Sequence, residues 1–204
     1  MENIEQYIAE VQGTLNRLSA KVIYNVIGVL EYARANNKRI FIMGNGGSAA
    51  TSSHFACDLG KGTIQPDRPR FRVIALTDNM PLFSAYANDM GYEHVFSEQL
   101  ASLVERGDVV IGISGSGNSE NVLKAIKLAN SMGAITIGMT GFDGGKLKGL
   151  ADLCLHVPSS CMGQAEDVHV ILVHLMCTCL RKAPEGHYQA PSELVKVGTG
   201  AARG

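Results

Sequence analysis

The sequence predicts an α/β fold with three layers, in which a central parallel sheet lies between two layers of helices, with further helices at the N-terminus. Three observations support this prediction. Short, continuous apolar runs alternate with longer stretches of helical periodicity, which is typical of strands buried on both faces. Loops rich in glycine and serine follow two of the runs, where a strand turns into a helix. The first 36 residues show helical periodicity and no strand pattern.

Two helices are expected in the N-terminal segment. Apolar residues recur every three or four positions from Ile4 to Leu18, and a second helical stretch runs from Ala20 to Ala35. The second stretch has an apolar face that is wide for a surface helix. Two interpretations are open: this helix packs on its own sheet, or it also forms a contact between subunits.

Five strands are expected in the core, three from strong apolar runs and two from weaker ones. The strong runs are 39–43, 109–113 and 134–139, and the weaker ones are 71–76 and 153–157. Helices are expected from Ala49, after the second loop through Ala129, and from Ala165 to Leu180 before Pro184.

The predicted organisation is one domain over residues 1–204. It comprises a helical segment at 1–36, an α/β core at 37–182 and a tail at 183–204, whose Gly/Ala-rich end from Val195 is expected to fray. Of the 204 residues, 46% are hydrophobic and 18% charged, and the net charge is −1, which favours a large core over disorder. Without a basic face, a signal peptide or a long apolar segment, we expect a cytoplasmic protein that binds neither nucleic acid nor membrane.

Both glycine- and serine-rich loops are predicted to bind an anion. They are Gly44–Ser48 and Ser114–Ser119, and each is expected at the carboxyl end of a parallel strand, where ligands bind in open α/β sheets. Glycine allows backbone amides to approach a ligand, and the free amides at a helix start point towards anions. Serine hydroxyls add small donors, and no Gly-Lys-Ser/Thr triplet of a P-loop is present. The loops therefore favour a phosphomonoester.

Several polar residues could act beside these loops. His54 and Asp58 are spaced i, i+4 and share a helix face. Acidic and histidine side chains also interrupt the apolar pattern of the last helix, where polar groups need partners or face a site. These residues are Glu166, Asp167, His169 and His174.

The motifs together resemble the sugar isomerase (SIS) domain, and most of all its bacterial phosphoheptose isomerases. They are Phe41–Ala50, His54–Ala56, Asn88–Asp89, Ile113–Ser119, His169 and His174. The resemblance covers roughly residues 5–182. It implies an aldose–ketose isomerase that converts sedoheptulose 7-phosphate to D-glycero-D-manno-heptose 7-phosphate through an enediol. It also implies one zinc ion per subunit and a homotetramer with sites at the subunit interfaces.

The resemblance assigns roles to individual residues. It makes Asp58 and His174 catalytic, and the metal ligands His54, Asp58, Glu166 and His174. The implied substrate contacts are Asn45, Gly46, Gly47, Ser48, Asn88, Asp89, Ser114, Gly115, Ser116, Ser119 and Glu166.

Two positions depart from the family pattern. Asp58 is one methylene shorter than the glutamate of the family, and Glu166 carries a charge where the family has glutamine. Helical spacing leaves Asp167 open as an alternative site carboxylate, because it is seven residues from His174 and nearly on the same face. Two other functions also remain open: a non-catalytic sugar-phosphate-binding or scaffold protein like the replication-initiator-associated relatives, and an isomerase of another sugar phosphate.

Overall fold

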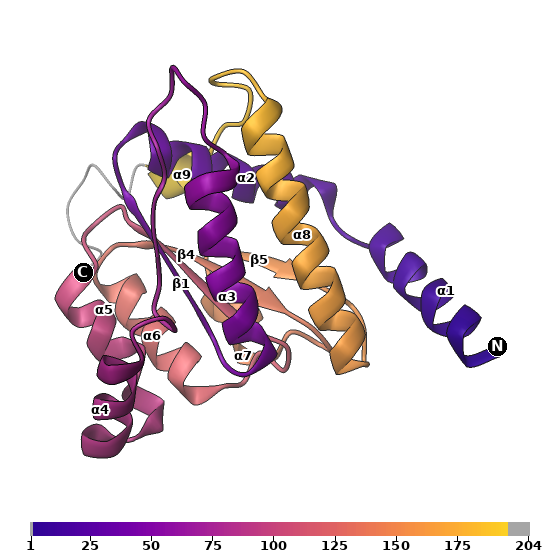
Figure 1. The fold of residues 1–204 in the computed structure, drawn as a ribbon, viewed down its shortest axis with the longest axis horizontal. Helices are drawn as coiled ribbons and strands as arrows, with labels where there is room; N and C mark the ends of the chain where they lie inside the picture. Colours follow the sequence, from indigo (N-terminus) through magenta and orange to yellow (C-terminus); the bar gives the residue numbers. More distant parts are fainter. Residues whose placement is uncertain (1, 196–204) are drawn as a thin grey trace.

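The computed structural model describes residues 2–195 as a parallel sheet of five strands between two layers of helices (Figure 1). The strands follow the order β2-β1-β3-β4-β5 across the sheet. Their bounds are β1 Arg39–Gly44, β2 Arg72–Ala75, β3 Val109–Ser114, β4 Ile135–Thr140 and β5 Leu153–His156. The predicted fold class is confirmed.

The helices include the predicted ones and several that the sequence analysis did not predict. The long helices are α1 Glu2–Asn16, α2 Ala20–Ala35, α3 Gly47–Cys57, α4 Met80–Met90, α6 Glu120–Ser131 and α8 Met162–Lys182. The short ones are α5 Ser97–Leu103, α7 Gly145–Leu150, α9 Ser192–Val195, the π-helix η1 Asp58–Gly62 and the 3₁₀ helix η2 Tyr92–His94. Fraying was predicted from Val195 onwards, and residues 196–204 lie outside the described part of the chain. No helix within residues 2–195 is long and apolar enough to cross a membrane.

Two hydrophobic cores lie on opposite faces of the sheet. Alternate residues of each strand serve opposite cores, because strand side chains point to the two faces in turn. In β1, Ile40 and Ile42 pack with α2, α3 and α8, whereas Phe41 and Met43 pack with α5 and α6. Burial on both faces explains why the strand sequences are continuously apolar.

The strand order places a switch in chain direction between β1 and β3. From β1 the chain passes through α3 to β2 on one side, and it then crosses to β3 on the other side. In doubly wound folds with the order 2-1-3-4-5, ligands bind at this point. Gly44 at the end of β1 is paired with Ile113 of β3, so the two loops that follow these strands are neighbours.

The N-terminal helices differ in their environment. The second half of α2 is buried and contacts β1, β5 and α8, so α2 packs on its own sheet. In contrast, α1 projects from the body and contacts α8 (Figure 1). Ile4 and Ile8 of α1 are 66% and 51% exposed, respectively.

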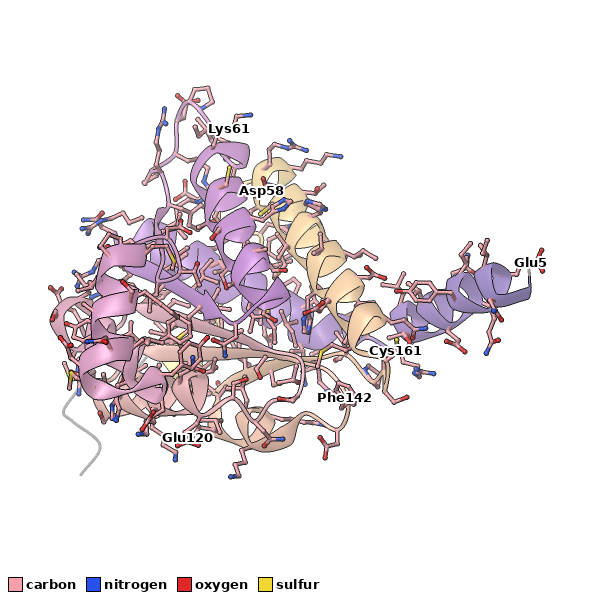
Figure 2. The ribbon with its side chains drawn as sticks, turned by 60° about the horizontal axis from the view of Figure 1, so that its bottom comes forward. Glu5, Asp58, Lys61, Glu120, Phe142 and Cys161 are labelled. Atoms are coloured by element: carbon pink, nitrogen blue, oxygen red, sulfur yellow. The ribbon has the colours of Figure 1, made fainter. Side chains whose placement is uncertain are left out.

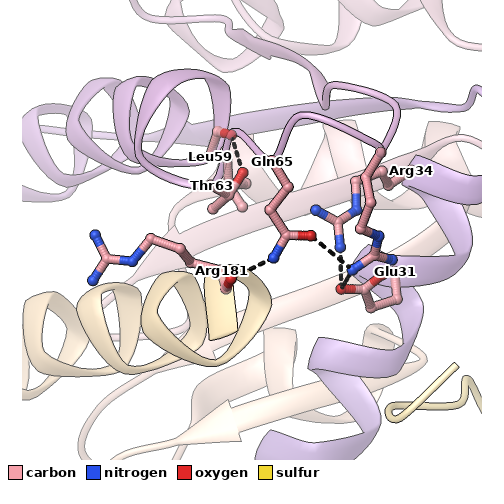
Figure 3. A network of polar contacts seen from close by, with 7 residues as sticks. Glu31, Arg34, Leu59, Thr63, Gln65 and Arg181 are labelled. Atoms are coloured by element: carbon pink, nitrogen blue, oxygen red, sulfur yellow. Dashed lines mark hydrogen bonds and ion pairs between the residues drawn. The ribbon is translucent and has the colours of Figure 1, made fainter. Parts of the chain in front are cut away.

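A buried ionic network anchors the segment between η1 and β2 (Figure 3). Glu31 of α2 pairs with both Arg34 and Arg68, and all three side chains are at most 10% exposed. Next to them, Gln65 donates a hydrogen bond to the carbonyl oxygen of Arg181 in α8. The network therefore ties the chain after η1 to α2 and to the C-terminal end of α8.

Candidate active site

The first loop leads from β1 into α3 and requires glycine at two points. Gly46 has φ +54° and ψ −123°, which a residue with a β carbon rarely adopts. A β carbon on Gly44 would lie 2.8 Å from the Ser48 side chain and 2.9 Å from the Ile113 carbonyl oxygen. The loop thus brings backbone N–H groups at the start of α3 to the edge of the sheet, where the helix dipole favours an anion.

The second loop runs from Ser114 at the end of β3 to Ser119, the N-cap residue of α6. The Ser114 and Ser119 hydroxyl oxygens are 3.0 Å apart, and the Ser116 hydroxyl accepts a hydrogen bond from the Asn118 N–H at 3.2 Å. Gly117 has φ +65° and accepts a hydrogen bond from the Leu147 N–H at 3.0 Å. The loop is therefore held in a fixed shape by its own serines and by α7.

His54, Asp58 and His174 form a compact polar group between α3 and α8. Figure 2 shows Asp58 at the end of α3, facing α8. Its Oδ2 lies 3.3 Å from His54 Nε2 and 3.6 Å from His174 Nε2, and the two imidazole nitrogens are 3.0 Å apart. The ligand-type atoms of all three residues lie within 4.8 Å of one another. Residues 120 positions apart in the chain thus meet in one cluster, as the sequence analysis predicted.

The local helix geometry places Asp58 at a change of helix type. α3 is α-helical through Cys57, and the π-helix η1 begins at Asp58. A π-turn interrupts regular i→i−4 bonding and is often found at functional sites. Although Asp58 opens the π-helix, its backbone N–H still bonds the His54 carbonyl oxygen, so the two residues keep the i, i+4 spacing that places them on one face.

The three side chains suit a divalent transition metal. Two imidazoles and a carboxylate are donors that zinc accepts, at about 2.0–2.2 Å from the ion. Ligand atoms at these distances in a tetrahedral site lie about 3.3–3.6 Å apart. The observed separations of 3.0, 3.3 and 3.6 Å are close to this range.

Glu166 and Asp167 lie elsewhere than this cluster. The predicted set of four ligands included Glu166, but the structure groups only the other three. The Glu166 carboxylate lies against Gly47 instead, where an added β carbon would be 2.6 Å from Oε1. Eight helical residues separate Glu166 from His174, which is about 12 Å along the helix axis. Asp167 accepts a hydrogen bond of 2.6 Å from the Tyr7 hydroxyl of α1. This bond raises the pKa of Tyr7 to about 12 and accounts for Asp167 without a role in the site.

The remaining predicted site residues are spread around the edge. Asn88 and Asp89 lie at the exposed end of α4, where the Asn88 amide donates to the Asp89 carboxylate at 2.7 Å. His169 is 1% exposed, and burial lowers its pKa to about 4, although the nearby Thr140 backbone acts in the opposite direction. His169 is thus a buried residue of α8 that lies outside the cluster.

Two polar residues at the first loop were missed by the sequence analysis. The amide of Asn121 in α6 and the hydroxyl of Tyr92 in η2 both bond the Asn45 side chain. Asn121 follows Ser119 by two residues, on the buried side of α6, and this is a signal that could have found it. Tyr92 gave no such signal, because it lies in a three-residue 3₁₀ helix that no sequence pattern marks.

Comparisons with known proteins identify the family of the chain. Residues 6–141 match the family model of the SIS domain. The chain is 38% identical over 183 residues to the phosphoheptose isomerase of a Nitratiruptor species, covering 88% of this chain and 97% of that protein.

Solved structures are similar over the same range. The phosphoheptose isomerase of Neisseria gonorrhoeae superposes with a TM-score of 0.81 at 32% identity, over 89% of this chain and 98% of that one. The one from Francisella tularensis gives a TM-score of 0.82 at 28% identity, over 89% and 96% of the two chains. The chain belongs to the SIS domain family and, within it, to the phosphoheptose isomerase family.

Proposed function

We propose that this protein is an aldose–ketose isomerase that converts sedoheptulose 7-phosphate to D-glycero-D-manno-heptose 7-phosphate through an enediol. The observation that carries the proposal is the His54–Asp58–His174 cluster, whose first member lies on the helix that begins at the first of the two loops predicted to bind an anion. The chain is 38% identical to a phosphoheptose isomerase over 97% of that protein. The loops supply a place for the phosphate, and the cluster supplies groups that exchange protons.

The reaction moves a proton between adjacent carbons and needs a base and an acid. We assign the base to Asp58, which removes the proton next to the carbonyl group. His174 exchanges protons with the substrate oxygens as the enediol forms and collapses. The two groups lie 3.6 Å apart, so one substrate can reach both.

We propose one zinc ion per subunit, held by His54, Asp58 and His174. Three protein ligands are typical of catalytic zinc sites, which keep the fourth position for water or substrate. When bound, the ion polarises the substrate oxygens and stabilises their negative charge. Asp58 has a second carboxylate oxygen, which could still accept a proton if the other oxygen were ligated.

The charge of Glu166 favours a second candidate. Its carboxylate lies at the first loop, against Gly47, where an anionic ligand is expected. A carboxylate there disfavours a phosphate at the first loop, leaves the second loop for that group, and favours a neutral hydroxyl-bearing part of the ligand beside Gly47. The second candidate is an isomerase of another sugar phosphate, and a non-catalytic binding or scaffold protein is a third outcome of the same test.

The test is turnover of sedoheptulose 7-phosphate by metal-free protein, with and without added zinc. We expect activity that rises with zinc and falls at least about a hundredfold in His174→Ala, while His187→Ala, which changes an exposed histidine outside the cluster, has no effect. Turnover of a different C5–C7 sugar phosphate alone supports the second candidate. Tight binding without turnover, or neither, contradicts the enzyme assignment.

We further propose a single SIS domain that acts in the cytoplasm as a homotetramer with sites at subunit interfaces. The exposed apolar side chains of α1 and the exposed position of Asn88 and Asp89, away from the cluster, support an assembly that completes the site.

A further inference from the structure

Three polar side chains from separate parts of the chain meet at the first loop. The amides of Asn45, after β1, and Asn121, in α6, form a reciprocal pair with two hydrogen bonds of 2.9 Å each. The Tyr92 hydroxyl, from η2, donates to Asn45 Oδ1 at 2.9 Å. Asn121 is 3% exposed, so the pair is shielded from water on its α6 side.

The direction of every bond in this network follows from one backbone group. The Val122 N–H can only donate, and it donates to Asn121 Oδ1 at 2.9 Å. The Asn45 atom that also faces Asn121 Oδ1 must therefore be the donor Nδ2. Asn45 Oδ1 then accepts from Asn121 Nδ2 and from Tyr92, which fixes the orientation of both amides.

A count of donors shows what remains for a ligand. A side-chain amide has two N–H donors and an oxygen that accepts two bonds. Asn45 Oδ1 is filled by Asn121 and Tyr92, and one N–H of Nδ2 is taken by Asn121. The other N–H is left for a ligand oxygen at the loop.

We propose, on the basis of the function proposed above, that Asn121 and Tyr92 are positioning residues. They hold the Asn45 amide so that it offers an N–H donor, and not a carbonyl acceptor, to an oxygen of the bound sugar phosphate. Without them the amide could rotate and present its oxygen, which repels ligand oxygens.

Tyr92 allows a clean test. Its ring packs edge-on against Phe83 with centroids 5.7 Å apart, and the side chain is 52% exposed. Tyr92→Phe therefore keeps the ring contact and removes only the hydroxyl bond. Tyr24→Phe is the matched control, because it removes a 2.8 Å hydroxyl bond to the His187 carbonyl oxygen, outside the loop network.

The first measurement is the affinity for sedoheptulose 7-phosphate by calorimetry, in a His174→Ala background that prevents turnover. We expect Tyr92→Phe to weaken binding about three- to tenfold, the effect of one neutral hydrogen bond, and Tyr24→Phe to leave it unchanged. In an Asn45→Ala background Tyr92→Phe should have no further effect, because it acts through Asn45. Independent, additive losses would overturn the proposal.

The second measurement does not depend on substrate. In protein labelled with ¹⁵N-asparagine, the side-chain NH₂ signals of Asn45 are identified by their loss in Asn45→Asp. They should shift in Tyr92→Phe and in Asn121→Asp, and stay in place in Tyr24→Phe. If the parent protein binds no sugar phosphate, the proposed function fails, and the NH₂ signals alone test the positioning roles of Tyr92 and Asn121. Signals that do not move in these variants would overturn those roles.

Discussion

At the residue scale, the contact between Gly47 and Glu166 links the first loop to α8. An added β carbon at Gly47 would lie 2.6 Å from Glu166 Oε1, which is the flexible end of a side chain. A methyl group there displaces the carboxylate and leaves the backbone in place. Glu166 can therefore occupy this position only because residue 47 has no side chain.

Gly47→Ala tests this contact. We expect the KM for the sugar phosphate to change at least about threefold, with less than about 1 kcal/mol change in the free energy of unfolding, because only a mobile carboxylate must move. In a Glu166→Ser background the same change should have little effect on KM. The control is Gly13→Ala in α1, where the added methyl meets nothing within 4 Å. Equal effects of Gly47→Ala in both backgrounds would contradict the role of Glu166.

His169 makes stability depend on pH. Its pKa in the folded protein is about 4, against 6.5 for an ordinary histidine. Between these values the unfolded chain binds a proton that the folded protein does not, so the free energy of unfolding falls as the pH is lowered from 6.5 to 4. The loss is on the order of 3 kcal/mol at full effect.

Urea unfolding at about pH 7.5, 5.5 and 4.5 measures this dependence. His169→Asn should flatten the acid limb relative to the parent, and His187→Asn, at an exposed histidine, should not. An unchanged slope in His169→Asn would mean that other groups cause the acid sensitivity.

Residue types and their order in the chain were enough to predict three residues that the structure brings together, and the two loops at the ends of β1 and β3. Gly44–Ser48 and Ser114–Ser119 were identifiable because they interrupt apolar strands, and His54 with Asp58 because they share a helix face. The partners of Asn45 were not identifiable, because Tyr92 and Asn121 reach it only through tertiary packing. The placement of Glu166 and Asp167 likewise depended on contacts with Gly47 and Tyr7 that no helical spacing specifies.

At the scale of elements, η1 and the segment that follows it connect the cluster to the rest of the protein. Asp58 opens η1, and the chain beyond it is fixed to α2 by the Glu31–Arg34–Arg68 network and to α8 by Gln65. Removing the buried carboxylate leaves two guanidinium groups without their shared partner.

Glu31→Gln should therefore lower the free energy of unfolding by about 3–5 kcal/mol, the range for breaking a buried ion pair from one side. Arg72→Gln is the control, because its exposed side chain donates to the Asn37 carbonyl oxygen and forms no part of the network. Both are measured by urea unfolding at neutral pH. A loss in Glu31→Gln no larger than that in Arg72→Gln would show that the network adds no stability.

Short elements were the least predictable. The five strands were recognised because burial on both faces leaves continuous apolar runs. Helices α4, α5 and α7 have between 6 and 11 residues, and helices this short are stabilised by tertiary contacts more than by their own sequence. The π-helix η1 packs against α8, and a single widened turn has no periodicity that a sequence reveals.

At the scale of the whole molecule, α1 carries apolar surface that the rest of residues 2–195 does not cover. Ile4 is 66% exposed and Ile8 51%, on a helix that projects from the body. The proposed tetramer would bury these side chains.

Ile4→Glu/Ile8→Glu should shift the protein to smaller species in sedimentation velocity, because charges in an apolar interface are costly. Lys21→Glu changes an exposed charge of α2 and serves as the control. If the double variant sediments like the parent, α1 takes no part in assembly.

The His54–Asp58–His174 cluster has a consequence for how the protein is made. Two of its members leave the ribosome more than a hundred residues before the third, and α8 must dock on α3 before the cluster exists. A nascent chain can thus complete its central strands and still have no proton-exchanging site. The cluster to which catalysis is assigned above can therefore form only once the final long helix has docked.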